Sequence, residues 1–547
     1  MRMLQYIKRW LRTFSKTKSH TSEQKEIFEY IKSNSGHLII DAVAGSGKTT
    51  TIIECINYIP NDKLILFCAF NKKIRDEISN RTNDTGKDLI VKNLHQLGFE
   101  LIKQNRVTCT VNNKKYRNLF RKLKEGVLKK LLSEYEEVTN SNPFGYYTLS
   151  DKDTYFEFEN LILNITEKVR STFLENDSIV FKELLLHYNL VNFKSFSESV
   201  TEKLYTILFE ISNNIIEEGN RIYFTEGIID YTDMLYIPGK FKYESKFKFD
   251  YLFIDECQDL SKSQLEIAFK YKKSEGTVIA VGDPKQSIYG FTGADVESFY
   301  RISERLEGHS KLKLSYCFRC PDKVIELAKK YRSDIRSYKL QKGCIKRIKS
   351  SEITKFISSN DLVLSRTHDN LAKILITLIS SGKNIKIDKE ALSNILAGIN
   401  RIFKKEEIET IDIFREDPLF FKKIEERRLY IINKSIRNGD EADVADEIDY
   451  VKKMIELLQN LGVKNPKIKT LKELIELFVN RVNNHPNAIE LSTIHSAKGL
   501  ERDNIFILDY NKLPAFRSNH SDWEREQEKN LTYVALTRAK KNLYLVE

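Results

Sequence analysis

Long apolar runs and paired cysteines are scarce in this sequence. No stretch of about 20 apolar residues is present, as a membrane-spanning helix needs, and the N-terminus lacks the apolar core of a secretory signal. The seven cysteines are odd in number and spread from Cys55 to Cys344, which does not suit a disulfide framework. Cys317 and Cys320 have CxxC spacing, but no second pair with metal-ligand spacing accompanies them. We therefore expect a soluble, cytoplasmic protein in a reducing compartment, with no membrane partner.

Length and charge narrow the class of protein further. The 547 residues are too many for one compact core and predict about three or four domains. The formal net charge of +12 favours a polyanionic partner, with nucleic acid the first candidate and an acidic membrane surface the second. Residues 1–20 carry apolar residues at near-helical spacing among basic ones, which suits either a membrane-surface helix or a frayed basic arm.

Short apolar runs alternate with helical stretches along the chain. Such runs begin at Leu38, Leu64 and Tyr251, and others follow towards the C-terminus. This alternation predicts an α/β fold with parallel sheets. Two blocks, 105–220 and 373–485, instead repeat Lys, Glu, Leu and Ile at helical period with very few glycines and prolines, so they predict largely helical insertions.

A phosphate-binding loop is predicted near the N-terminus. The segment HLIIDAVAGSGKTTT places an apolar strand, a loop of small residues and a helical run in the order that such a loop requires. Its glycines let backbone amides approach the phosphates. Lys48 would reach the β and γ phosphates, and the Thr49 hydroxyl would bind Mg²⁺. We expect ATP contacts from Ala44, Gly45, Ser46, Gly47, Lys48, Thr49 and Thr50.

Two adjacent carboxylates follow a second apolar strand, in FDYLFIDECQD. Asp255 and Glu256 lie where the strand ends, at the edge at which α/β sheets bind ligands. Asp255 could hold the Mg²⁺ that bridges phosphate oxygens, while Glu256 could orient and deprotonate the attacking water. Together with the phosphate loop, this pair predicts hydrolysis of ATP.

Further motifs surround these two in an order that resembles one protein family. They are TSEQKEIF at residue 21, CAFNKKI at 68, NLHQLGF at 93, IDYTDMLY at 229, AVGDPKQSIYGFTGA at 280, LSYCFRCP at 314, LSRTH at 364, LSTIHSAKGLE at 491 and YVALTRAKKNLYL at 533. In this order they resemble the UvrD/Rep group of superfamily 1 DNA helicases, and among these the smaller members related to the F-box DNA helicases.

The resemblance implies roles for residues around the nucleotide. Gln24 would read the adenine, and Phe318 would stack on it. Gln286 and Arg319 would contact the γ-phosphate, and Arg538 would be an arginine finger. With the residues named above, the expected catalytic set is Lys48, Glu256, Gln286, Arg319 and Arg538.

Two motifs would link the nucleotide to DNA. Tyr289 and Phe291 would present aromatic faces to the bases, and stacking of this kind tolerates any sequence. The family often has tryptophan where Phe291 stands. Thr493 and His495 would face DNA, while Glu501 would face the ribose or the arginines that sense the phosphate.

Two earlier motifs would grip single-stranded DNA. The resemblance carries this contact onto Phe70, Asn71 and Lys72 in the first and onto His95 in the second. Asn93 stands where the family usually has threonine.

The implied architecture is α/β, with two RecA-like parallel-sheet motor domains that each carry a mainly helical inserted subdomain. The expected ranges are a basic arm at 1–20, the first motor domain at 21–104 and 221–305 with its insertion at 105–220, and the second motor domain at 306–372 and 486–547 with its insertion at 373–485. IDYTDMLY would return the chain from the first insertion to the motor core, and LSRTH, where Arg366 could contribute, would start the second motor domain.

The implied function is an ATP- and Mg²⁺-dependent single-stranded DNA translocase and helicase that travels 3′ to 5′. Expected partners are single-stranded DNA, junctions of single- and double-stranded DNA, and a separate nuclease or repair protein. Three alternatives stay open at this point: an RNA-directed ATPase of the same superfamily, a non-catalytic nucleic-acid-binding scaffold, and a membrane-associated ATPase that uses the N-terminal arm.

Overall fold

The computed structural model describes two long stretches of the chain, 20–387 and 470–547. Within them it leaves out 34–35, 70–71, 83–85, 107, 141–147, 175–176, 189, 192, 194–195, 291–297, 484 and 517–519, and between them it describes residues 392, 422, 426 and 429. The expected basic arm and most of the expected second insertion therefore lie outside the described residues.

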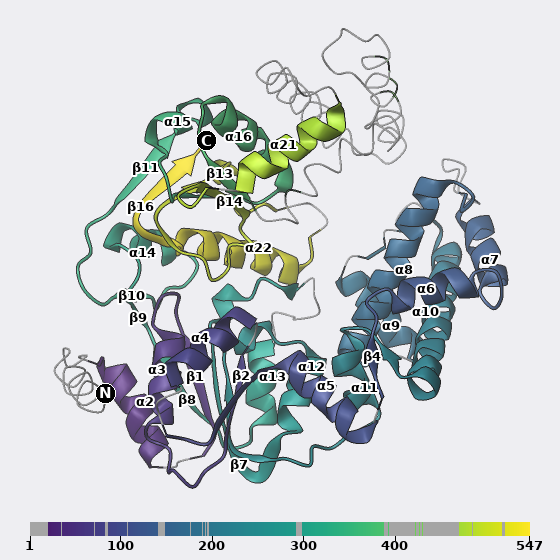
Figure 1. The fold of residues 1–547 in the computed structure, drawn as a ribbon, viewed down its shortest axis with the longest axis horizontal. Coiled ribbons are helices and arrows are strands. Elements are labelled where there is room, and N and C mark those ends of the chain that lie inside the picture. The colour runs from purple at the N-terminus through teal and green to yellow at the C-terminus, as the bar shows by residue number, and fades with distance from the viewer. Residues whose placement is uncertain are drawn as a thin grey trace.

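Six parallel strands form the first sheet (Figure 1). In spatial order they are β3 (Leu89–Asn93), β2 (Ile65–Ala69), β6 (Phe249–Ile254), β7 (Lys272–Gly282), β1 (Leu38–Ala42) and β8 (Ser310–Leu314). Every residue of β1 and β2 is buried, as expected for parallel strands with both faces covered. The same domain holds α2 (Ser22–Lys32), α3 (Lys48–Ile56), α4 (Lys72–Thr82), α5 (Leu94–Asn105), α11 (Asp233–Lys240), η1 (Cys257–Asp259), α12 (Lys262–Phe269), η2 (Pro284–Gln286) and α13 (Ser298–Arg305).

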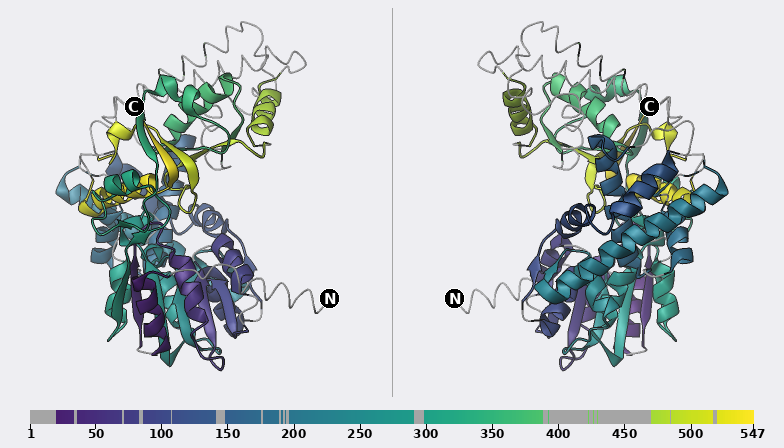
Figure 2. Two further views of the ribbon diagram at one scale, coloured as in Figure 1. Left: turned by 90° about the vertical axis from the view of Figure 1, so that its left-hand side faces the viewer. Right: turned by 90° about the vertical axis from the view of Figure 1, so that its right-hand side faces the viewer.

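A second sheet of six parallel strands follows. Its spatial order is β11 (Cys344–Ile348), β16 (Ala539–Val546), β15 (Arg502–Ile507), β12 (Leu362–Ser365), β14 (Ile489–Thr493) and β13 (Ile385–Ile387). Around it lie the small ladder of β9 (Tyr316–Cys317) and β10 (Arg336–Ser337), and α14 (Asp322–Ala328), η4 (Ser350–Glu352), α15 (Ile353–Phe356), α16 (His368–Ser380), α21 (Leu471–Asn483), η5 (Tyr510–Lys512) and α22 (Asp522–Leu536). The predicted α/β fold with two parallel-sheet domains is confirmed, and Figure 2 shows the two lobes one above the other.

Helices predominate between β3 and β6, as expected for the first insertion. They are α6 (Lys115–Leu123), α7 (Lys129–Thr139), α8 (Lys152–Thr172), α9 (Ser178–His187) and α10 (Glu198–Glu226), with a short ladder of β4 (Thr110–Val111) and β5 (Ile228–Ile229). Their buried side chains form one apolar core that is separate from the cores of the sheets.

A buried ion cluster attaches this insertion to the first motor domain. Asp233 accepts hydrogen bonds from Lys115 (2.6 Å), Tyr116 (2.9 Å) and Arg170 (2.7 Å), three residues of the insertion. Asp233 begins α11, which packs on α5 of the motor domain so closely that a Cβ on Gly98 would lie 2.0 Å from the Met234 carbonyl oxygen. The segment IDYTDMLY therefore joins insertion and motor core.

The sheets move two of the expected domain boundaries. Strand β8 pairs with β1, so the first sheet continues to Leu314 and the boundary at 305/306 is too early. Helix α16 spans the boundary at 372/373, and β13 after it still pairs with β14, so the second insertion cannot begin before β13 ends. Both strands are edge strands, whose position depends on pairing that local sequence does not specify.

The N-terminal end of α22 joins the second motor domain to the first insertion. The ring of Trp523 stacks on His187 at the end of α9, with 4.9 Å between centroids, and its indole N–H donates to the His187 carbonyl at 2.7 Å. The same ring lies against the first motor domain, because a Cβ on Gly290 would be 2.7 Å from Trp523 Cζ3. Three units of the chain therefore meet at Trp523.

Candidate nucleotide site between the motor domains

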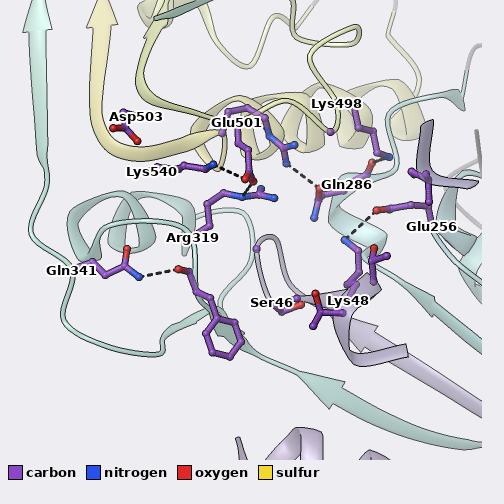
Figure 3. Close-up of a pocket in the computed structure, with 18 of the residues that line it drawn as sticks. Ser46, Lys48, Glu256, Gln286, Arg319, Gln341, Lys498, Glu501, Asp503 and Lys540 are labelled. Atoms are coloured by element: carbon purple, nitrogen blue, oxygen red, sulfur yellow. Dashed lines mark hydrogen bonds and ion pairs between the residues drawn. The ribbon is translucent and has the colours of Figure 1, made fainter. Parts of the chain in front are cut away.

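The phosphate loop lies between β1 and α3. Gly45 (φ +68°) and Gly47 (φ +78°) have left-handed backbones, and a Cβ on Gly45 would lie 2.8 Å from Arg319 Cβ. The Gly45 carbonyl accepts the Phe318 amide at 2.9 Å, so this loop packs directly on the second motor domain. Lys48 opens α3 and is largely buried, which leaves its ammonium group directed into the cleft (Figure 3).

Two carboxylates follow β6 beside this loop. Asp255 is fully buried and accepts a hydrogen bond from the Thr49 hydroxyl at 3.0 Å. Burial, with the neighbouring Glu256, raises the pKa of Asp255. Burial acts in the same direction on Glu256, but Lys48, whose Nζ is 3.6 Å away, and Lys498 outweigh it and lower the pKa of Glu256. The two neighbours therefore differ in proton affinity, and Glu256 is the one that stays ionised.

The phosphate loop and Glu256 form one wall of a cleft of about 740 Å³, and the second motor domain forms the other (Figure 3). Cations predominate along it, since its lining includes Lys48, Arg81, Arg319, Lys498, Arg538, Lys540 and Lys541 beside Glu256, Glu501 and Asp503. Such a surplus of positive charge in a partly buried cleft suits a polyphosphate.

Glu501 organises the second wall. Its carboxylate pairs with Arg319 Nε at 2.5 Å and with Lys540 Nζ at 2.7 Å. Burial would raise the pKa of Glu501, but Arg319 and Lys540 lower it, so the carboxylate stays ionised. Arg319 is held again by the Thr537 carbonyl at 3.1 Å, and its guanidinium is thereby fixed at the cleft.

Arg538 reaches from the second motor domain to Gln286 in the first. It is 2% exposed, and its Nη2 donates to Gln286 Oε1 at 3.2 Å while Nε is held by the Val534 carbonyl. Burial, followed by Arg319, lowers the pKa of Arg538 to about 10. Two arginines held close together in a buried place indicate that this wall is built to receive an anion.

Some contacts across the cleft involve residues that the motif analysis did not single out. Lys498 forms a short ion pair with Asp259 and donates to the Gln286 carbonyl at 2.6 Å. The Tyr533 hydroxyl oxygen accepts a hydrogen bond from the Ala44 amide of the phosphate loop at 3.0 Å. Lys498, Asp259 and Tyr533 all stand inside quoted motifs, so the motif positions could have pointed to them, but their partners are distant in sequence.

The remaining expected ATP contacts are not all at the cleft. Ser46, Thr50 and Phe318 line it, and the Phe318 ring lies 4.4 Å from the ring of Tyr338. Gln24 is not among the lining residues. Its amide oxygen accepts the Thr21 amide at 3.0 Å and its nitrogen donates to Thr51 at 3.0 Å, so adenine reading by Gln24 stays a prediction.

Only some of the residues expected to contact DNA lie near one another. The Tyr289 hydroxyl donates to the His495 carbonyl at 3.3 Å, and Lys498 lies over the Tyr289 ring at 5.1 Å. Burial, with Arg366 next, lowers the pKa of His495 to about 3, so its imidazole is neutral. Thr493 is buried and accepts the Ser496 amide at 3.2 Å.

His95 lies on the other motor domain, in α5. Its ring meets Tyr231 edge-on at 6.4 Å, and Asn93 before it accepts the Gln96 amide at 2.9 Å and thereby caps the helix. Phe70, Asn71 and Phe291 lie outside the described residues, as does the side chain of Lys72. Arg366 forms an ion pair with Glu528 of α22 at 2.7 Å.

Comparisons with known proteins agree with this arrangement. The family described as the UvrD/REP helicase N-terminal domain matches residues 21–307, and the UvrD-like helicase C-terminal domain matches residues 488–546. The chain belongs to the UvrD/Rep helicase family. It is therefore a member of the family that the order of its motifs predicts.

Individual relatives extend over nearly the whole chain. ATP-dependent DNA helicase Rep of Buchnera aphidicola subsp. Schizaphis graminum is 23% identical, with 95% of this chain and 92% of the relative covered. F-box DNA helicase protein 1 of Schizosaccharomyces pombe is 25% identical over 97% of this chain, which spans 57% of that relative. ATP-dependent DNA helicase PcrA of Bacillus subtilis is 21% identical, with 94% and 81% covered. The predicted likeness to F-box DNA helicases is confirmed.

Two kinds of feature are absent from the described residues. None of their helices is both long and apolar enough to cross a membrane. Within the same ranges, no three His, Cys, Asp or Glu side chains are grouped as a metal site.

Proposed function

We propose that this chain is an ATP-dependent DNA helicase, a motor that moves along single-stranded DNA. The observation that carries the proposal is the cleft itself, where a phosphate loop and a carboxylate on one motor domain face two held arginines on the other. Because both walls are needed to surround one triphosphate, ATP binding would draw the domains together, and hydrolysis would release them.

In this mechanism the first motor domain binds the nucleotide and activates the attacking water. Lys48 holds the β and γ phosphates, and Glu256, kept ionised by Lys48 and Lys498, orients the attacking water and accepts its proton. The side chain of Gln286, held beside Arg538, contacts the γ-phosphate. These roles give ATP hydrolysis without a covalent intermediate on the protein.

The second motor domain would supply charge in the transition state. Arg319 and Arg538 would stabilise the negative charge that spreads over the transferring γ-phosphoryl group, which for arginine fingers contributes about 10³ to 10⁵ in rate. Both guanidinium groups are already fixed, Arg319 by Glu501 and Arg538 by backbone carbonyls, so little reorganisation is needed.

The residues expected to hold Mg²⁺ fit a divalent cation. The Thr49 hydroxyl and the Asp255 carboxylate are 3.0 Å apart, and a cation there would stabilise the ionised form of a fully buried carboxylate. Bound Mg²⁺ would neutralise charge on the phosphate oxygens.

Contacts between the motor domains suggest how DNA would be coupled to the nucleotide. Tyr289 and His495 meet each other, and Lys498 touches both Tyr289 and the carbonyl of Gln286. A displacement of the Tyr289 ring by a stacked base would therefore act on the segment that carries Gln286. We propose travel in the 3′ to 5′ direction, loading at junctions of single- and double-stranded DNA, and cooperation with a separate nuclease or repair protein.

Steady-state ATP hydrolysis with and without nucleic acid tests this proposal. We expect strong stimulation by single-stranded DNA, weaker stimulation by duplex DNA and RNA, and loss of turnover in Glu256→Gln. Equal stimulation by RNA would favour an RNA-directed ATPase, and no hydrolysis under any condition would favour a scaffold. Unwinding of duplexes with either a 3′ or a 5′ single-stranded tail would then give the direction.

A further inference from the structure

Arg332 is an almost buried arginine that the sequence motifs do not include. It follows α14 in the second motor domain and is 8% exposed. Its guanidinium reaches three carboxylates, with 2.7 Å to Asp41, 2.6 Å to Asp334 and 3.5 Å to Asp283. Asp41 and Asp283 belong to the first motor domain, so this one side chain crosses between the domains behind the nucleotide cleft.

The two carboxylates across the boundary stand beside functional segments. Asp41 lies in β1, directly before the phosphate loop. Asp283 follows β7 and accepts a hydrogen bond from Gln286 Nε2 at 2.7 Å. Gln286 Oε1 in turn accepts from Arg538 at 3.2 Å. A continuous polar chain therefore runs from the phosphate-loop strand through Arg332 and Asp283 to the residue expected to contact the γ-phosphate.

This polar chain of contacts determines which way the Gln286 amide faces. A carboxylate that is ionised can only accept, so Asp283 binds the NH₂ group and leaves the amide oxygen towards Arg538 and the cleft. Asp283 is fully buried, and burial raises its pKa, while Arg332, followed by Lys48, limits that rise. Without a cation beside it, the buried carboxyl would favour the protonated form, which donates as well as accepts.

We propose that Arg332 is a positioning residue for ATP hydrolysis, which holds Asp283 as an acceptor and thereby orients Gln286 relative to the phosphate loop. The inference rests on the proposed function, because the orientation of Gln286 matters only if the cleft hydrolyses ATP. Arg332 does not line the cleft and touches no expected substrate atom, so it acts through Gln286.

A double-mutant cycle tests whether the two residues act as one unit. Steady-state ATP hydrolysis is measured with saturating oligo(dT) for the wild type, Arg332→Met, Gln286→Ala and the double variant. We expect Arg332→Met to lower kcat by about ten- to a hundredfold with little change in KM for ATP, as a misplaced group would. We expect the double variant to be no slower than Gln286→Ala, because Arg332 then has nothing left to orient.

Two further variants serve as controls, one at a matched arginine and one a conservative substitution of Arg332. Arg336 also pairs across the domains, with Glu23 at 2.9 Å, but does not connect to Gln286, so Arg336→Ala should hydrolyse ATP at the wild-type rate. Arg332→Lys keeps the charge but not the forked geometry, so its kcat should lie between those of Arg332→Met and the wild type. It replaces Arg332→Met if that variant does not fold.

The outcomes separate this inference from the proposed function. If the kcat losses of Arg332→Met and Gln286→Ala multiply in the double variant, or if Arg332→Met and Arg332→Lys are as fast as the wild type, the positioning role is wrong while the ATPase stands. If the wild type hydrolyses no ATP with or without DNA, both proposals are wrong.

Discussion

The two motor domains have the same kind of sheet but contribute different chemistry to the cleft. Each sheet has six parallel strands. The first brings the phosphate loop, Asp255 and Glu256, which in the proposed mechanism bind a nucleotide and activate water. The second brings Arg319 and Arg538, which are held by Glu501 and by backbone carbonyls. In the proposed mechanism nucleotide binding and the triggering of hydrolysis therefore belong to separate domains, so that turnover would depend on how closely the domains approach.

The largest effect is expected when the arginine finger of the second motor domain is removed alone. Arg538→Ala should lower DNA-stimulated kcat by about 10³ to 10⁵ while leaving ATP binding intact, because the finger acts on transition-state charge. Stopped flow with a fluorescent ATP analogue measures binding, and phosphate release measures turnover. Lys541→Ala is the matched control, since Lys541 also lines the cleft but pairs with the exposed Asp503. Normal stimulated turnover in Arg538→Ala would remove the finger assignment.

The reciprocal test removes the activating group on the first domain. Glu256→Gln should lower kcat by about 10² to 10⁴, the usual contribution of a general base, with ATP affinity retained. Asp503→Asn changes a carboxylate on the opposite wall of the same cleft and should leave kcat close to the wild-type value. If both substitutions slowed hydrolysis equally, the two walls would not differ in the way described above.

A smaller effect is expected from cutting one link between the domains. Lys498→Met removes the pair with Asp259 and the bond to the Gln286 carbonyl, so the rate with single-stranded DNA should fall by about tenfold, a loss of about 1.4 kcal/mol. The rate without DNA should fall less, because Lys498 connects Tyr289, which would contact DNA, to the nucleotide site. Comparing the two rates in one preparation measures the coupling, and an equal drop in both would show that Lys498 acts on catalysis alone.

The smallest effect concerns stability at the contact between α22 and the phosphate loop. Tyr533→Phe deletes the hydroxyl that accepts the Ala44 amide, which leaves a buried N–H without that partner at a cost of about 1 to 3 kcal/mol. Thermal unfolding should show a lower melting temperature, by about 2 to 4 °C per kcal/mol for a domain of this size. Tyr544→Phe, in the second sheet away from the cleft, is the reference, and an equal shift in both variants would argue against a special role for Tyr533.

Local sequence was sufficient to predict the parts of the site in which the functional residues come directly after a strand. The phosphate loop follows its strand within a few residues, and Asp255 and Glu256 come directly after theirs, so both could be predicted from HLIIDAVAGSGKTTT and FDYLFIDECQD. The alternation of apolar runs predicted two parallel sheets for the same reason.

Contacts between distant segments could not be predicted in this way. Arg332 and Asp41 are 291 positions apart, and Tyr533 and Ala44 are 489 apart, so their pairing depends on how the domains pack. The amide of Gln24 bonds to Thr21 and Thr51, which a motif that assigns it to adenine does not indicate. The edge strands β8 and β13 were assigned to the wrong side of a boundary because edge pairing is a tertiary property.

The junction at Trp523 gives the molecule an optical probe of its own. The chain has two tryptophans, Trp10 and Trp523, so Trp10→Phe would leave Trp523 as the sole indole fluorophore. Its ring stacks on His187 of the first insertion and lies against Gly290 of the first motor domain, while its helix leads to Arg538. Emission from this single ring would therefore report, without any attached dye, when the insertion and α22 separate during a cycle of ATP hydrolysis.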